Sequence, residues 1–252
     1  MVCLHGDEHK KRRKLENKIF TREIFQKYEN IIFPKTINET LDPYKETGEM
    51  DLVDFGFRVL LNLTADFSGI DRPLKSKKET ETLLRLLKIF ASGATLHHST
   101  RDHDEVKDEV REALKEFDRD FLTPSIERRK SIISQNSNED LPNDILTVLL
   151  VNDDQLNMPY DVLQREIAFY LLAGAQTSIH SLVHAFHEIH TWLENNPSRK
   201  DDITNDPIFV QKCFLESTRL HPSSPVALRK PVCPVQLPGN KSADVDLSLI
   251  HI

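Results

Sequence analysis

The sequence contains little glycine and little cysteine. Among 252 residues there are 7 Gly and 3 Cys. Sheets and hairpins use many glycine turns, so the shortage of glycine indicates a mainly helical chain. The cysteines, Cys3, Cys213 and Cys233, are widely spaced and odd in number. This argues against a disulfide framework or a zinc site, and it favours reduced thiols in a cytoplasm.

Two further absences limit the class of protein. No run of 18 or more apolar residues occurs, and the charged first 30 residues lack the apolar core of a signal peptide, so we expect neither a membrane span nor secretion. There is no excess of positive charge, because the net charge is -7, so the molecule as a whole is not built to hold nucleic acid. An apolar fraction of 38% over 252 residues is enough for one large domain or two small ones.

The longest helical pattern is Asp161–Ile189. From Ile167 to Ala175 it is apolar all round, which predicts a helix buried on every side. Gly174 lies in the middle of this stretch, where a glycine costs about 1 kcal/mol relative to alanine. Its presence indicates a close approach to the helix backbone. Thr177 is expected to turn its hydroxyl onto a carbonyl one turn earlier and to open the helix locally.

Six other stretches also show helical spacing and are predicted as helices: Asp7–Phe20, Glu23–Ile37, Glu49–Phe67, Glu79–Ala91, Asp144–Val151 and Pro207–Leu220. A long charged helix is predicted over Asp104–Ser134, with a kink near Pro124. Pro43 is expected to end the helical pattern that begins at Glu23. Asn157 is expected to cap the long helix. Only short extended pieces are predicted after Pro222.

The helix at Asp7–Phe20 carries a dense run of basic residues. Such a run is ordinarily a solvated helix face. A second interpretation is an anion site, because His9 and Arg13 are four residues apart and project from one face, where they could clamp a carboxylate or phosphate. The residues alone leave both interpretations open.

Two polar groups on later helices have similar alternatives. Glu216 and Arg219 are three residues apart among apolar neighbours, so they form either an exposed pair or a buried structural network. His180, His184 and His187 share one face of the long helix. A metal-binding bundle would need further ligands, and the absence of any Glu-x-x-His spacing favours ordinary polar-face histidines instead.

Four segments together carry a family resemblance. The sequence AGAQTS at Ala173–Ser178, followed by ESTRLHP at Glu216–Pro222 and PVALR at Pro225–Arg229, resembles the cytochrome P-450 family of haem-thiolate monooxygenases. The upstream segment Gly6–Leu15 resembles the family's helix beneath one haem edge. Their order and rough spacing match the soluble bacterial type. The resemblance implies a mainly α fold: a P-450-like helical domain fragment built around one long central helix, with little β structure near the C-terminus.

The resemblance implies roles around a haem b. His9, Arg13 and Arg229 would bind its propionates. Ala173 and Gly174 would leave room for O2 and substrate, and bound dioxygen would accept a hydrogen bond from the Thr177 hydroxyl. That hydroxyl would also help to deliver the protons needed for O–O cleavage.

The remaining roles concern the scaffold and the partners. Glu216 and Arg219 would form a structural ion pair, and Val226 and Ala227 would line the substrate pocket. The implied partners are a small apolar organic substrate, O2, and a ferredoxin or flavoprotein electron donor. The implied location is the cytoplasm.

The chain departs from the family at two places. The family usually has an acid before the threonine, whereas this chain has Gln176. An amide orients water but does not relay a proton by titrating. The family's iron ligand is a cysteine in a glycine-containing loop, and neither Cys213 nor Cys233 has those surroundings. The thiolate favours O–O cleavage, so the chain as given is expected to be inactive and not to bind haem stably.

These departures lead to an expectation about the extent of the chain. We expect residues 1–246 to be a partial P-450 domain that lacks the N-terminal β region and the cysteine loop. Residues 247–252 are expected to be an adapter-derived tail. The competing hypothesis is a non-catalytic helical interaction protein derived from the same scaffold.

Overall fold

The computed structural model describes residues 6–135, 141–224, 227–229 and 248–250, with the last two segments described as backbone only. The chain divides into two compact units, Met1–Ile179 and His180–Ile252. The first part of the chain forms α1 (Gly6–Glu16), α2 (Arg22–Lys27), the π-helical turn η1 (Tyr28–Ile32), α3 (Phe33–Lys45), α4 (Leu52–Ser68), α5 (Lys77–Ala94) and η2 (Leu96–His98).

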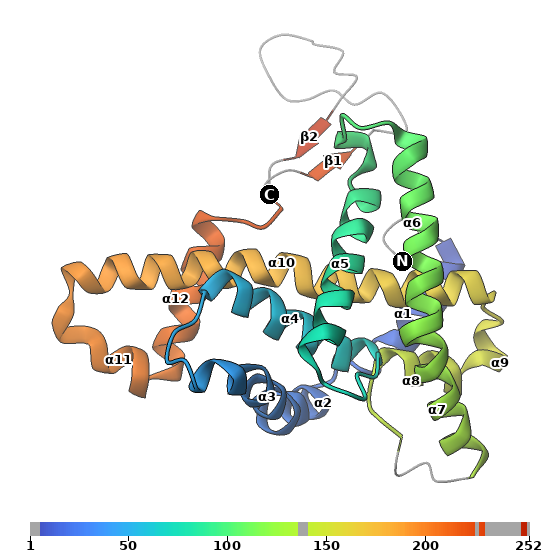
Figure 1. Cartoon of the computed structure of the whole chain (residues 1–252), viewed down its shortest axis with the longest axis horizontal. Coiled ribbons are helices and arrows are strands. Elements are labelled where there is room, and N and C mark those ends of the chain that lie inside the picture. Colours follow the sequence, from blue (N-terminus) through green and yellow to red (C-terminus); the bar gives the residue numbers. More distant parts are fainter. Residues whose placement is uncertain (1–5, 136–140, 225–226, 230–247, 251–252) are drawn as a thin grey trace. The chain divides into compact units, whose positions relative to one another are not determined.

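The elements that follow are again mostly helices. They are α6 (His103–Phe117), the π-helical turn η3 (Asp118–Leu122), α7 (Thr123–Ser134), α8 (Ile145–Val151), α9 (Asp153–Leu156), α10 (Tyr160–Asn195), η5 (Pro197–Arg199), α11 (Lys200–Asn205) and α12 (Pro207–Leu220) (Figure 1). The predicted mainly helical fold with one long helix, α10, is therefore confirmed. The adjacent short strands β1 (Ala227–Arg229) and β2 (Ser248–Ile250) pair antiparallel, with Leu228 opposite Leu249.

The core of the first unit is a cluster of aliphatic and aromatic side chains. Helices α5 and α6 run side by side in it (Figure 1). Its fully enclosed members come from α4, α5, α6, η3, α8 and the first half of α10: Leu61, Leu83, Leu86, Leu87, Phe117, Leu122, Ile145, Leu146, Ile167, Leu171 and Ala175. Burying a Leu, Ile or Phe side chain stabilises a fold by about 1.5–3 kcal/mol. This cluster therefore fixes the first half of α10 firmly.

Only one side of α10 is enclosed. Ala168, Leu171, Ala175 and Ile179 recur at helical spacing and are buried. Thr177, on the opposite side, is exposed. Within the predicted stretch Ile167–Ala175, Phe169, Leu172 and Ala173 are half-buried and Gly174 is exposed, so the prediction of a helix buried on every side is wrong.

Two proline positions test the predicted helix breaks. Pro43 does not end its helix, since α3 continues to Lys45. It lies in the last turns of α3, where its missing amide removes only one hydrogen bond of the helix. Pro124 follows the π-helical turn η3, which lies between α6 and α7, and the residues on either side of η3 keep helical dihedral angles. The chain therefore stays helical through this region, and the kink stays a prediction. Asn157 does not cap α10. It ends α9 in a left-handed conformation with φ 45°.

A buried arginine joins three segments of the first unit. Arg129 of α7 is 2% exposed, and its Nη2 lies 2.6 Å from Asp144 Oδ2, while its Nη1 lies 3.1 Å from Asp71 Oδ2. Asp144 also accepts the Thr147 amide at 2.8 Å and so caps α8. Burial alone would lower the pKa of Arg129, but the charges of Asp144 and Asp71 reverse that effect and raise it. The arginine therefore stays charged and holds α7, α8 and the α4–α5 connection together.

The second unit packs through aromatic rings. Trp192 and Phe209 have centroids 5.5 Å apart. His184 stacks on His221 at 4.6 Å, and His221 Nε2 lies 2.8 Å from Glu188 Oε1. Within the described residues no group of three or more His, Cys, Asp or Glu side chains could hold a metal ion. In the same residues no helix has the length and apolar character needed to cross a membrane.

Candidate functional site

The accessible side of α10 carries the residues that the sequence singled out. Ala173 and Gln176 are half-buried, whereas Gly174 and Thr177 are exposed. Thr177 Oγ1 donates a hydrogen bond to the Ala173 carbonyl at 2.8 Å, as predicted. The helix nevertheless continues unbroken from Tyr160 to Asn195. The expected local opening of α10 is therefore wrong.

The close approach predicted at Gly174 is made by α4. A Cβ atom at Gly174 would lie 2.6 Å from Thr64 Cγ2 and 3.1 Å from Thr64 Oγ1. Thr64 is 9% exposed, and its hydroxyl donates to the Leu60 carbonyl at 2.7 Å, which restrains its rotamer. The glycine thus lets two helices meet closely. This long-range contact had no signal in the local sequence.

Helix α1 is fastened to α10 by buried polar contacts. Tyr170 donates a hydrogen bond to Glu16 Oε2 at 2.5 Å. Arg12 is 8% exposed, contacts Glu8 and lies 3.7 Å from Glu166 Oε2. The basic run of α1 is therefore divided, because Arg12 faces the protein and takes part in its packing.

Burial shifts the titration of the carboxyl group at this joint. It raises the pKa of Glu16 to about 7, the Tyr170 hydrogen bond works against the rise, and the nearby Glu166 charge adds to it. Burial and Glu16 likewise raise the pKa of Tyr170. The contact between α1 and α10 thus includes a carboxyl group that titrates near neutral pH.

His9 and Arg13 lie next to this joint on α1. His9 is half-buried and Arg13 is exposed, and they are one turn apart, as the spacing predicted. The Arg13 guanidinium lies over the Phe20 ring, 5.8 Å from its centroid. No salt bridge within the described residues occupies either side chain. Both remain available to an external carboxylate, which is the property that propionate binding requires.

An apolar groove lies beside α10 between residues 165 and 172, just before Ala173, and sequence reasoning missed it. It has a volume of about 440 Å³, within the ordinary range for small-molecule sites. Its apolar lining comes from the end of α5, the start of α6 and the first half of α10, and includes Phe90, Val110, Leu114, Ala168, Phe169 and Leu172. The amphipathic spacing of α5 and α6 predicts helices with apolar faces, but not which part of each face stays uncovered.

The Glu216–Arg219 pair forms, but in a different environment from the buried network that was considered. The side chains are joined in a two-point contact, Nη2 to Oε1 at 2.6 Å and Nε to Oε2 at 2.9 Å. The side chain of Arg219 is 67% exposed and that of Glu216 is 58% exposed. Their apolar neighbours include Leu215 and Leu220, which are themselves exposed. The pair is therefore exposed, and the buried structural network is not formed.

Several predicted residues have no described side chain. Ala227 and Arg229 belong to β1 and are described as backbone only. Val226, Cys3 and Cys233 lie outside the described residues. Cys213, which is described, is half-buried in α12, and burial raises the pKa of its thiol. Cys213 therefore does not have the character of a thiolate ligand.

No protein-family model and no curated protein matches the sequence. Solved structures match the fold. CalO2 has a TM-score of 0.71 at 16% identity, over 98% of this chain and 57% of that one. The zebra fish cytochrome P450 solved with progesterone has a TM-score of 0.71 at 18% identity, over 98% and 62%. The Tepidiphilus thermophilus P450 heme domain has a TM-score of 0.69 at 18% identity, over 98% and 55%. The chain therefore has a cytochrome P450-like fold and spans somewhat more than half the length of these structures.

Proposed function

We propose that this chain is the central helical part of a haem-dependent monooxygenase, which inserts one oxygen atom from O2 into an apolar organic substrate. The observation that carries the proposal is the asymmetry of α10. Its apolar side is packed in the core, while the Thr177 side chain is exposed on the other side. The matching fold supports the same interpretation.

The chain's own residues would bind and orient the reactants. His9 and Arg13, together with Arg229, would hold the propionates of a haem b. The bound haem would supply the activation of O2. The Thr177 hydroxyl would position a proton next to the oxygen, and Gln176 would orient a water molecule, since an amide both donates and accepts hydrogen bonds.

The apolar groove supports an apolar substrate. Its wall contains the rings of Phe90 and Phe169, and side chains of this kind bind ligands chiefly by excluding water. Two of the matching structures have apolar ligands: progesterone in the zebra fish protein, and a hexadec-9Z-enoic acid group on the acyl carrier protein bound to P450BioI. We propose that Val226 and Ala227 complete the substrate pocket.

The iron ligand and the electron donor belong to the proposal as well. We assign the ligand to a cysteine of a longer parent protein, because Cys213 does not fit that role. The electron donor would be a ferredoxin or a flavoprotein, and the exposed cations of α1, such as Lys10 and Lys14, supply charge for an acidic partner. A cytoplasmic location is consistent with this chemistry.

The decisive experiment uses the complete parent reading frame. The purified parent should hold haem, give a thiolate-type reduced-CO spectrum, and transfer ¹⁸O from O2 to its product. Thr177→Ala should lower the amount of product formed per electron consumed, and Thr177→Ser should restore it. A complete parent that holds no haem would refute the proposal and favour the non-catalytic interaction protein.

The chain as given offers a second test. Haemin added to it should be lost during gel filtration. Stable retention with a thiolate-type reduced-CO band would contradict the assignment of the iron ligand to a longer parent.

A further inference from the structure

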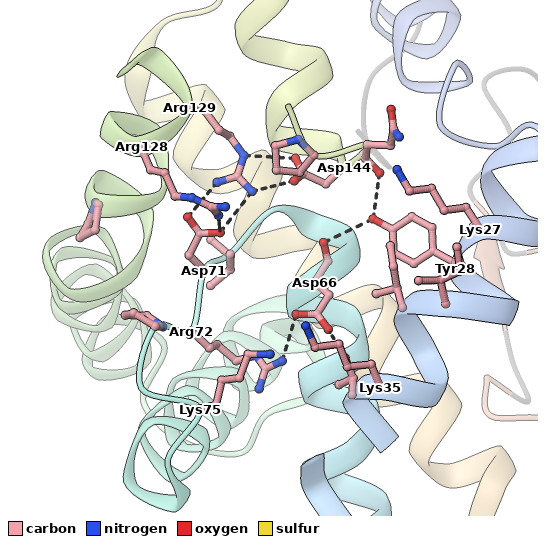
Figure 2. Close-up of a pocket in the computed structure, with 18 of the residues that line it drawn as sticks. Lys27, Tyr28, Lys35, Asp66, Asp71, Arg72, Lys75, Arg128, Arg129 and Asp144 are labelled. Carbon is pink, nitrogen blue, oxygen red and sulfur yellow. Dashed lines mark hydrogen bonds and ion pairs between the residues drawn. The ribbon is translucent and has the colours of Figure 1, made fainter. Parts of the chain in front are cut away.

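A second pocket of the first unit lies away from α10. It has a volume of about 700 Å³ and shares no lining residue with the apolar groove. Figure 2 shows four parts of the chain around it: the α2–α3 segment with Lys27, Tyr28 and Lys35, the α4–α5 connection with Asp71, Arg72 and Lys75, α7 with Arg128 and Arg129, and the segment before α8 with Asp144. It is large enough for an organic ligand.

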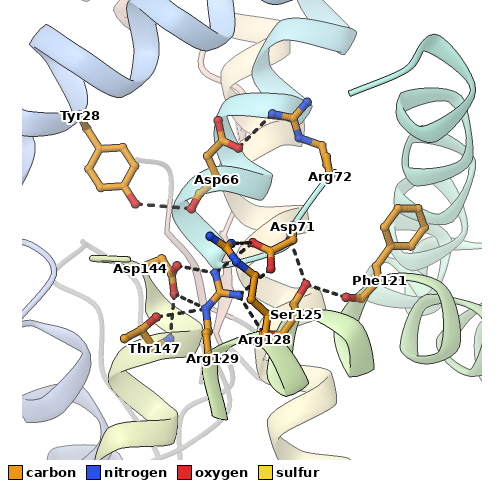
Figure 3. Close-up of polar contacts among 10 residues, drawn as sticks. All are labelled: Tyr28, Asp66, Asp71, Arg72, Phe121, Ser125, Arg128, Arg129, Asp144 and Thr147. Carbon is orange, nitrogen blue, oxygen red and sulfur yellow. Dashed lines mark hydrogen bonds and ion pairs between the residues drawn. The ribbon is translucent and has the colours of Figure 1, made fainter. Parts of the chain in front are cut away.

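The carboxylates of this pocket are already paired. Asp66 accepts hydrogen bonds from Arg72 at 2.9 Å and from Thr36 at 2.5 Å. Asp71 lies 2.7 Å from Arg128, and Asp144 lies 2.6 Å from Arg129, as Figure 3 shows. The fourth lining acid, Asp120, is paired with its neighbour Arg119 at 2.6 Å. The acids therefore leave no strong site for a cation.

The basic residues outnumber these acids. Six basic and four acidic residues line the pocket, a surplus of two positive charges in a protein whose net charge is -7. Lys27 and Lys35 account for the surplus, because among the described residues neither has a charged partner. Arg72 has a side chain only 3% exposed, and its Nε has no hydrogen-bond partner in the described part of the chain. That Nε is enclosed by the protein, so the free cations that a ligand can reach are the exposed Lys27 and Lys35.

Apolar side chains form the rest of the wall. They are Ile31, Ile32, Ile70, Pro73, Pro124 and Pro142, together with the ring of Tyr28. Tyr28 is 2% exposed and is fixed by a hydrogen bond to the Asn143 carbonyl at 2.8 Å. Ile31 is 63% exposed. A ligand that covers Ile31 would gain contact area while its charged end meets the lysines.

We propose that this pocket binds an amphipathic organic anion, an apolar body that carries one carboxylate or phosphate group. The anionic group interacts with Lys27 and Lys35, and the apolar body covers Ile31. The site is independent of haem and of the proposed monooxygenase activity. Because the ligand binds the folded pocket and not the unfolded chain, it stabilises the first unit by mass action.

Decanoate and inorganic phosphate are suitable probes for the full chain, with decanol as the uncharged control. Calorimetric titration should give binding of one decanoate, weaker binding of phosphate, and weaker binding of decanol. The double variant Lys27→Gln/Lys35→Gln should weaken decanoate about fivefold or more, since each exposed charge contributes a fraction of 1 kcal/mol up to about 1 kcal/mol. Lys88→Gln/Lys130→Gln also removes two positive charges, at positions outside the pocket, and should leave binding unchanged.

Ile31→Asn distinguishes the contribution of the ligand's apolar body to binding from that of its anionic group. It should weaken decanoate and leave phosphate binding unchanged, because only the apolar body contacts residue 31. Equal decanoate affinity in the wild-type chain and the double lysine variant would overturn the proposal. So would decanol binding as tightly as decanoate. Lys27 and Lys35 are exposed, so a thermal melt of each variant without ligand should match the wild-type chain and shows that the fold is intact.

Discussion

The stability of the chain should fall as the pH rises through neutrality, because of Glu16. Its carboxyl group lies at the joint between α1 and α10, where Tyr170 donates to it at 2.5 Å and Glu166 lies nearby. Burial raises its pKa from 4.5 to about 7. The folded state therefore holds a proton that the unfolded chain releases at a lower pH.

The sign of the effect follows from proton linkage. Below pH 4.5 Glu16 is protonated in both states, and its neutral form fits the buried joint. Between pH 4.5 and 7 the unfolded chain ionises first, so the free energy of unfolding decreases as the pH rises. One pKa unit corresponds to about 1.4 kcal/mol, which gives an upper limit near 3 kcal/mol. Solvent near the surface helix α1 screens part of this interaction, so we expect the free energy of unfolding to decrease by about 2 kcal/mol.

Glu16→Gln tests this reasoning, because glutamine keeps the acceptor for Tyr170 and removes the charge. Denaturant unfolding at pH 4 and pH 8 should show the variant about 2 kcal/mol more stable than the wild-type chain at pH 8 and nearly equal at pH 4. Glu23→Gln, on the exposed α2 surface, should show no such difference. A Glu16→Gln variant that is equally stabilised at both pH values would refute the titration of Glu16 as the cause.

Two further predictions concern packing in the first unit. Gly174→Ala should destabilise the chain by about 1–2 kcal/mol, because the new methyl group meets Thr64 Cγ2 at 2.6 Å. Adding Thr64→Ala should remove that penalty, because the nearest remaining atom, Cβ, lies at 3.5 Å; additive effects of the two changes would contradict the close contact. Arg129→Met should cost about 3–5 kcal/mol in urea unfolding, since it leaves Asp144 buried without its partner. Arg128→Met, a half-exposed neighbour, should cost less than about 1 kcal/mol, and a similar cost at both positions would refute the buried ion pair as the cause.

Much of the helical framework could be predicted from local sequence. Helical spacing located α10 and α12, and Asp144 just before an apolar run marked the start of α8. The small residues near Thr177 indicated both a close approach and a back-bonded hydroxyl. These features depend on residues within one or two turns of each other, so the sequence contains them directly.

Features that depend on long-range packing could not be predicted in the same way. Thr64 is 110 positions from Gly174, and nothing near either residue indicates that they meet. The apolar neighbours of Glu216 left an exposed pair and a buried network both open, and the structure decides for the exposed pair, since Leu215 is itself 66% exposed. The Lys27–Lys35 pocket combines four separate stretches of the chain. Each of these outcomes depends on which helix faces are covered, a property of the assembled fold.

The continuity of α10 has a consequence for hydrogen exchange. The helix runs from Tyr160 to Asn195, but the boundary between the two compact units falls after Ile179. Amides near Leu171 and Ala175 are enclosed by the core of the first unit, so their exchange should require its global unfolding. The protection of amides beyond His180 depends on the smaller second unit, so these amides should exchange through local openings that cost less free energy than global unfolding. One unbroken helix should therefore show a step in amide protection along its length.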